Sequence, residues 1–216
     1  MKPLRLVIVI SGAGSNMLAI ANACKSGELN AKVVLVVANR AEAQGLQRAN
    51  EQGLPTATLI PEPLEPREAF DRRLKDLIDA AQPDLVVLAG YMRILSSEFV
   101  ASYARRLLNI HPSLLPRHKG LNTHARALEA GDRHHGATVH LVTAELDGGP
   151  PLLQGRLQVR IDDSPETLTA RVREIEHRIY PETLQLIASS RLSLAASPPE
   201  LDGQPLVQAL TIDFEV

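Results

Sequence analysis

Two side chains with complementary chemistry lie two positions apart near the middle of the chain, Asn109 and His111. They end an apolar run that is typical of a buried strand, and Pro112 stops that strand because it cannot donate a ladder hydrogen bond. Side chains alternate between the two faces of a strand, so this amide and this imidazole point the same way. An amide can donate to a developing oxyanion and an imidazole can carry a proton. Either residue alone could be structural, but the pair at a strand end predicts a catalytic site.

A third polar group, the carboxylate of Asp147, stands in a turn of sequence Leu-Asp-Gly-Gly-Pro. Asp-Gly-Gly is ordinary turn chemistry, and alone it would indicate a structural role. Amide, imidazole and carboxylate together form an acyl-transfer site that needs no protein nucleophile. The sequence has no GxSxG element of a serine hydrolase. It also has no HExxH or Cys/His spacing, so we expect no metal.

A glycine-containing loop, Ser-Gly-Ala-Gly-Ser-Asn at residues 11–16, follows the first predicted strand. Backbone N–H groups and the dipole of the next helix make such a loop an anion site. A dinucleotide fingerprint would need a third glycine where the chain has Met17. Arg40 after the second strand could accept a 2′-phosphate, so an NADP-binding oxidoreductase stays an alternative. A single phosphate fits this short loop better.

The composition excludes several classes of protein. The net charge is -2 and aromatic residues make up 3%, which argues against a nucleic-acid or membrane surface as the main partner. No apolar run approaches the ~20 residues that span a bilayer. The single cysteine, Cys24, excludes an internal disulfide framework. We expect a cytoplasmic globular protein.

The elements that must position these groups alternate along the first half of the chain. Strands are predicted at residues 4–10, 31–38, 56–60 and 85–89 and in the run that ends at His111. Helices are predicted at 17–25, 43–52, 67–81 and 96–103. This order predicts an α/β, Rossmann-like fold with a mostly parallel central sheet and helices on both faces. Later we expect a helix from Thr123 to Ala130, strands at 136–142 and 151–159 that are partly antiparallel, and a long helix within 164–189.

Four segments together resemble the phosphoribosylglycinamide formyltransferase family. They are the loop at residues 11–16, Met-Arg-Ile-Leu at 92–95, Asn-Ile-His-Pro-Ser-Leu-Leu-Pro at 109–116 and Leu-Asp-Gly-Gly-Pro at 146–150. The third segment is shared with other folate-dependent formyltransferases, and the first points to the glycinamide ribonucleotide member. The resemblance runs to about Pro181.

The resemblance implies transfer of a formyl group from 10-formyltetrahydrofolate to the amine of glycinamide ribonucleotide, a step of de novo purine synthesis. The implied catalytic set is Asn109, His111 and Asp147. The implied phosphate and ribose contacts are Gly14, Ser15, Asn16 and Glu176. The implied folate-binding residues are Arg67, Met92, Arg93, Ile94, Leu95, Asn109, Thr143, Ala144, Glu145, Leu146 and Asp147. Asp147 would keep His111 in the right state and help to move a proton through water.

The resemblance also implies one formyltransferase domain over residues 1–190, with a phosphate-binding N-terminal half and a folate-binding C-terminal half. Residues 191–216 would form a tail with a hairpin. The chain departs from the family pattern at Ala13, Ala144 and Pro151, which affects the fine geometry of the folate loop. The oligomeric state is left open, with a homodimer as one alternative.

Other functions fit the sequence less well. Methionyl-tRNA formyltransferase adds a C-terminal RNA-binding domain, for which we expect no room after Ser189. Formyltetrahydrofolate deformylase usually adds an N-terminal regulatory domain, which we do not expect before a strand that starts at Leu4. A nucleotide-binding regulatory module would explain the loop but gives no reason for the amide, imidazole and carboxylate together.

Overall fold

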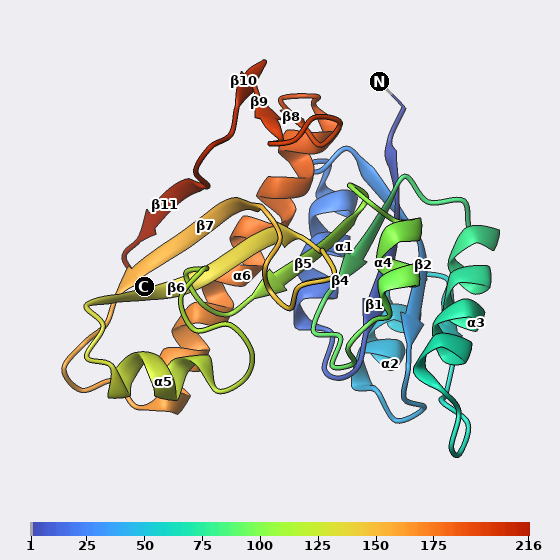
Figure 1. Ribbon diagram of the computed structural model, residues 1–216, viewed down its shortest axis with the longest axis horizontal. Coiled ribbons are helices and arrows are strands. Elements are labelled where there is room, and N and C mark those ends of the chain that lie inside the picture. The colour runs from blue at the N-terminus through green and yellow to red at the C-terminus, as the bar shows by residue number, and fades with distance from the viewer. Residues whose placement is uncertain (1) are drawn as a thin grey trace. The chain divides into compact units, whose positions relative to one another are not determined.

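The computed structural model describes residues 2–216, which divide into two compact units, 2–109 and 110–216. The elements of the first unit are β1 (Leu4–Ile10), α1 (Ser15–Ser26), β2 (Ala31–Ala38), α2 (Gln44–Glu51), β3 (Thr56–Thr58), α3 (Arg67–Ala80), β4 (Leu85–Leu88), α4 (Ser97–Ser102) and β5 (Leu107–His111), whose last two residues belong to the second unit (Figure 1). The elements of the second unit are α5 (Thr123–Glu129), β6 (His134–Leu141), β7 (Pro151–Gln158), α6 (Pro165–Ala188), β8 (Leu192–Ser193), β9 (Glu200–Leu201), β10 (Gln204–Pro205) and β11 (Leu210–Phe214).

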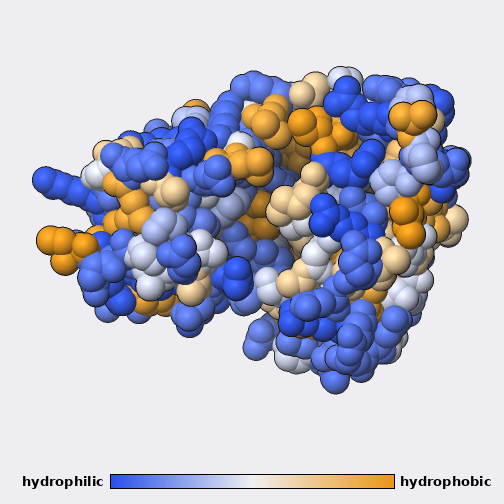
Figure 2. All heavy atoms as spheres, turned by 90° about the horizontal axis from the view of Figure 1, so that it is seen from below, coloured by the Kyte–Doolittle hydropathy of each residue, from blue (hydrophilic) through white to orange (hydrophobic). Residues whose placement is uncertain are grey.

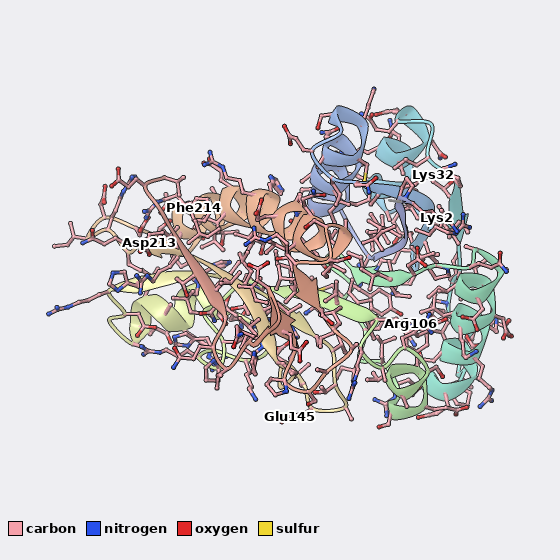
Figure 3. The ribbon with its side chains drawn as sticks, turned by 90° about the horizontal axis from the view of Figure 1, so that it is seen from above. Lys2, Lys32, Arg106, Glu145, Asp213 and Phe214 are labelled. Atoms are coloured by element: carbon pink, nitrogen blue, oxygen red, sulfur yellow. The ribbon has the colours of Figure 1, made fainter. Side chains whose placement is uncertain are left out.

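The first unit is built on a parallel sheet in the order β5-β4-β1-β2-β3. Its central strand β1 is an unbroken run of aliphatic residues from Leu6 to Ile10, all of them fully buried, as expected for a strand covered on both faces. The chain first adds β2 and β3 on one side of β1, and then adds β4 and β5 on the other side. Right-handed crossovers therefore put α1 and α2 on one face and α3 and α4 on the opposite face. Figure 3 shows these two helix layers on either side of the strands.

The second unit combines antiparallel and parallel pairing. β6 and β7 are antiparallel, and β7 also pairs in parallel with β11. The long helix α6 packs on β6 and β7. A Cβ atom on Gly155 of β7 would lie 2.1 Å from Cγ2 of Ile175, so the helix can approach the sheet this closely only because residue 155 is glycine.

The predicted fold class is confirmed: the sheet is mostly parallel, with helices on both faces and antiparallel pairing late in the chain. The predicted start of the first helix needs adjustment. α1 begins at Ser15 rather than Met17, because Gly14 at φ 72° serves as its N-cap. α5 begins at Thr123 as predicted, with Asn122 as its N-cap. In the region after Ser189, β9 and β10 form a short antiparallel pair, and β11 adds to β7.

Within residues 2–216, no helix is both long enough and apolar enough to cross a membrane. Hydrophilic side chains dominate the face seen in Figure 2, and hydrophobic ones form separate groups. Several exposed apolar side chains belong to segments that the resemblance assigns to the folate pocket: Met92, Ile94 and Leu146.

Candidate functional site

The end of β5 carries the amide and the imidazole at alternate positions. Asn109 is half-buried, pairs in register with Leu88 of β4, and is the last residue of the first unit. His111 lies in the second unit and is only 6% exposed. The strand stops here because Pro112 cannot continue the ladder, and the N–H of Ser113 donates to the carbonyl of His111 at 2.8 Å.

The turn after β6 shapes the position of Asp147. Gly148 N–H donates to the carbonyl of Glu145 at 3.1 Å, which closes the turn. Asp147 has a φ of 48°, a left-handed conformation that Asp tolerates better than most residues. The turn returns tightly to β6, because a Cβ on Gly149 would lie 1.9 Å from the carbonyl oxygen of Leu141. The turn thus directs a carboxylate inward, with 9% of the side chain exposed.

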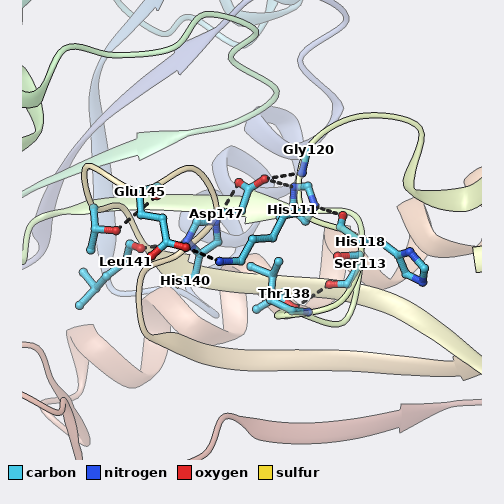
Figure 4. A network of polar contacts seen from close by, with 12 residues as sticks. His111, Ser113, His118, Gly120, Thr138, His140, Leu141, Glu145 and Asp147 are labelled. Atoms are coloured by element: carbon cyan, nitrogen blue, oxygen red, sulfur yellow. Dashed lines mark hydrogen bonds and ion pairs between the residues drawn. The ribbon is translucent and has the colours of Figure 1, made fainter. Parts of the chain in front are cut away.

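Three groups of the second unit surround the Asp147 carboxylate (Figure 4). Oδ2 lies 3.4 Å from Nδ1 of His111 and accepts a hydrogen bond from the N–H of Gly120 at 2.9 Å. Oδ1 lies 3.8 Å from Nε2 of His140. These contacts hold the Asp147 carboxylate facing the His111 ring.

The His111 ring lies between a carbonyl and a carboxylate. Nε2 is 3.0 Å from the carbonyl oxygen of His118. A carbonyl only accepts, so Nε2 carries a proton and donates it to this bond. A second proton on Nδ1 would point toward Asp147. The ring is therefore oriented from both sides.

His140 on β6 is a buried neighbour of the carboxylate that sequence reasoning missed. Its Nδ1 donates to the carbonyl of Leu141 at 2.8 Å, which fixes the tautomer. Burial lowers the pKa of His140 below its usual range, against the opposing effects of that carbonyl and of Asp147. The ring is thus neutral near pH 7 and offers a polar wall to the site rather than a second cation. A polar residue inside the apolar run of β6 was the available signal.

The loop between β1 and α1 has the features of an anion site. Ser11 fixes its start, because the Ser11 N–H donates to the carbonyl of Gly90 at 3.2 Å and its Oγ accepts from Met92 N–H at 2.9 Å. The N-cap of α1, Gly14, makes no side-chain capping bond, and the first turn contains no acidic residue. The positive end of the helix dipole therefore has no carboxylate to offset it. Ser15 and Asn16 are the first two residues of α1.

The other predicted residues of the first unit lie in exposed or half-exposed positions. Arg67 starts α3 and pairs with Glu68 at 3.5 Å, both side chains half-exposed. Arg93 is held more firmly, with its guanidinium carbon 4.5 Å from the centroid of the Phe70 ring. Its neighbours Met92 and Ile94 are more than half exposed. This loop after β4 thus offers apolar side chains and one stacked cation.

The predicted residues of the second unit form the exposed part of the turn and one position on α6. Thr143, Ala144, Glu145 and Leu146 are exposed, and Glu145 pairs with Lys119 at 2.7 Å. Glu176 is half-buried on α6, next to the fully buried Ile175. Of the predicted residues, the structure brings together His111 and Asp147 directly. Among residues 2–216, no group of three or more His, Cys, Asp or Glu could hold a metal ion.

Comparison with known proteins gives a family and close relatives. The pattern of the formyl transferase family matches residues 4–184. The chain is 51% identical over 203 residues to phosphoribosylglycinamide formyltransferase of Escherichia coli strain K12, covering 94% of this chain and 96% of that one. It is 39% identical to part of the human trifunctional purine biosynthetic protein adenosine-3, of which the match covers 19%.

Solved structures give the same result. The structure of phosphoribosylglycinamide formyltransferase from Coxiella burnetii has a TM-score of 0.91 and 46% identity, covering 96% of this chain and 99% of that chain. A formyltetrahydrofolate deformylase from Pseudomonas putida has a TM-score of 0.83 and 29% identity, covering 92% and 70%. This chain thus shares its fold with both of these proteins.

Proposed function

Because the chain belongs to the phosphoribosylglycinamide formyltransferase family, we propose that it transfers the formyl group of 10-formyltetrahydrofolate to the amine of glycinamide ribonucleotide. The chain is an enzyme of this transferase class, and the transfer is a step of purine biosynthesis. The proposal adds the donor, the acceptor atom and the residues that carry the reaction.

The observation that carries the proposed chemistry is the buried approach of Asp147 to His111, 3.4 Å between Oδ2 and Nδ1. A carboxylate beside an imidazole keeps the ring oriented and faces the proton that the ring carries during the reaction. The absence of a GxSxG element agrees with direct attack by the substrate amine rather than by a protein nucleophile.

The proposed reaction begins when the amine attacks the formyl carbon, forming a C–N bond and leaving negative charge on the formyl oxygen. The amide of Asn109 and the imidazolium of His111 stabilise that oxyanion. A water held by Asp147 takes the amine proton and passes it to the folate nitrogen. The oxyanion then re-forms the C=O bond as the bond between the formyl carbon and that nitrogen breaks. The products are the formamide and tetrahydrofolate, with no net change in protons.

The predicted phosphate- and ribose-binding residues and the predicted folate-binding residues would hold the two substrates. Gly14, Ser15 and Asn16 would bind the phosphate of the ribonucleotide at the uncompensated N-terminus of α1, and Glu176 would contact its ribose. The loop at 92–95, with Arg67 and the turn at 143–147, would bind the folate. Orientation of the amine toward the formyl carbon contributes several kcal/mol through avoided entropy loss.

The deciding experiment measures transfer with both substrates and runs donor hydrolysis without acceptor as the control. We expect product formation that depends strictly on glycinamide ribonucleotide. Donor hydrolysis at the same rate with and without the ribonucleotide would contradict the proposal and indicate a deformylase.

A further inference from the structure

A short segment, Arg117–Gly120, contacts both His111 and Asp147 through its backbone. The carbonyl of His118 accepts from Nε2 of His111 at 3.0 Å, and the N–H of Gly120 donates to Oδ2 of Asp147 at 2.9 Å. The segment thus contacts the His111 and Asp147 side chains through two main-chain groups, the carbonyl of residue 118 and the N–H of residue 120. Their positions therefore depend on whatever holds the segment in place.

The His118 side chain is the buried anchor of that segment. Its Nε2 lies 2.7 Å from Oδ2 of Asp132, and the two side chains are 11% and 5% exposed. The backbone at His118 has a φ of 54°, a left-handed conformation that is unfavourable for a residue other than glycine. A strained conformation persists only where its surroundings impose it, and the hydrogen bond with Asp132 is such a restraint.

Asp132 is itself fixed by the end of α5. Its N–H donates to the carbonyl of Ala127 at 3.0 Å, directly after Gly131 at φ 66°. Its second oxygen is bonded to Arg117, whose side chain is 62% exposed. The edge of His135 packs on the His118 ring, with centroids 6.2 Å apart. The carboxylate is thus attached to a helix end rather than to a mobile loop.

We propose that His118 and Asp132 are positioning residues for formyl transfer: their buried pair holds the carbonyl of residue 118 where it binds Nε2–H of His111. The Nδ1 atom of His111 is then the one left to face Asp147. The expected effect of this pair on turnover rests on the proposed function. Its expected effect on the His111 ring does not depend on that function.

The test compares Asp132→Asn and His118→Phe with a matched control, Arg117→Gln, which removes only the exposed partner of Asp132. We expect the first two variants to lower kcat about 10–100-fold with KM for both substrates within about twofold, because a small misplacement of the ring slows only the reaction. Nitrogen-15 NMR of the His111 ring should show a fixed Nε2–H in the wild type, and exchange between tautomers in these variants. Arg117→Gln should resemble the wild type.

The outcomes separate the two proposals. A lower melting temperature in Asp132→Asn, with kcat and the His111 signals unchanged, would overturn the positioning role. If Asp132→Asn does not fold, the comparison of His118→Gln with His118→Phe replaces it. His118→Gln should retain more activity, because glutamine can still donate a hydrogen bond to Asp132. Equal losses of activity in these two variants would overturn the proposal. Altered His111 signals in a protein whose wild type shows no transfer would contradict the proposed function and not the positioning of the ring.

Discussion

Nδ1 of His124 and Nε2 of His135 lie 3.1 Å apart, so one ring donates a hydrogen bond and the other accepts it. Protonation of the accepting nitrogen would break this bond. Burial lowers the pKa of each ring to about 4, and the effect is strengthened by Arg173 at His124 and by the neighbouring imidazoles at both. In the unfolded chain both rings titrate near 6.5.

We therefore expect stability to fall as the pH drops from about 6.5 toward 4, because the unfolded state then binds protons that the folded state refuses. With a discount for the half-buried His124, the two rings should lower the free energy of unfolding by about 1–2 kcal/mol between pH 7.5 and pH 5.5. Urea denaturation at the two pH values measures this difference. His124→Gln should reduce it, and an unchanged pH dependence in that variant would contradict the assignment.

Replacement of His111 by alanine should abolish most turnover. The variant removes the positive charge that faces the oxyanion, and loss of one such stabilising group typically costs ~10²–10³ in rate. Steady-state kinetics measures kcat, and circular dichroism checks that the fold is kept. Asn109→Ala should give a loss of the same order. A kcat near that of the wild type in either variant would remove the proposed mechanism.

Replacement of Asp147 by asparagine tests the carboxylate without disturbing the turn. Asparagine tolerates the left-handed backbone at φ 48°, and its side-chain oxygen can still accept from Gly120 N–H. It cannot pair with a charged His111, so we expect kcat to fall about 10²-fold or more. Asp213→Asn is the matched control, because Asp213 is an exposed aspartate that pairs with Arg156 and belongs to none of the proposed site residues. Similar kinetics in the two variants would argue against a role for the Asp147 charge.

The parts of the fold that follow from local patterns were predictable from the sequence. Buried aliphatic runs such as Leu6–Ile10 identify the strands, and their alternation with helices gives the parallel sheet. The pairing of β11 with β7 was not predictable, because a short strand near the end of a chain has several possible edges to join. Tertiary packing, rather than the sequence of the strand, makes that choice.

The site residues also divide into those that the sequence could predict and those that it could not. Asn109, His111 and Asp147 have side chains whose chemistry indicates a role, and the structure places the last two together. The contacts from His118 and Gly120 come from backbone atoms, which carry no signature in residue type. The neighbouring pair His118–Asp132 joins a loop to the segment that follows α5, so its formation depends on the path of the chain.

The two glycines of the loop after β1 give a matched pair of variants. A Cβ on Gly14 would lie 2.8 Å from the Cα of Gly45, and the backbone at φ 72° already disfavours a side chain. Gly14→Ala should therefore cost about 1–2 kcal/mol of stability from the backbone alone. It should also raise KM for the ribonucleotide, because the N-cap of α1 must shift. A Cβ on Gly12 meets nothing within 4 Å, so Gly12→Ala should keep wild-type stability. Thermal denaturation and KM measurements on both variants decide the matter, and equal behaviour would mean that the close approach at Gly14 has no bearing on phosphate binding.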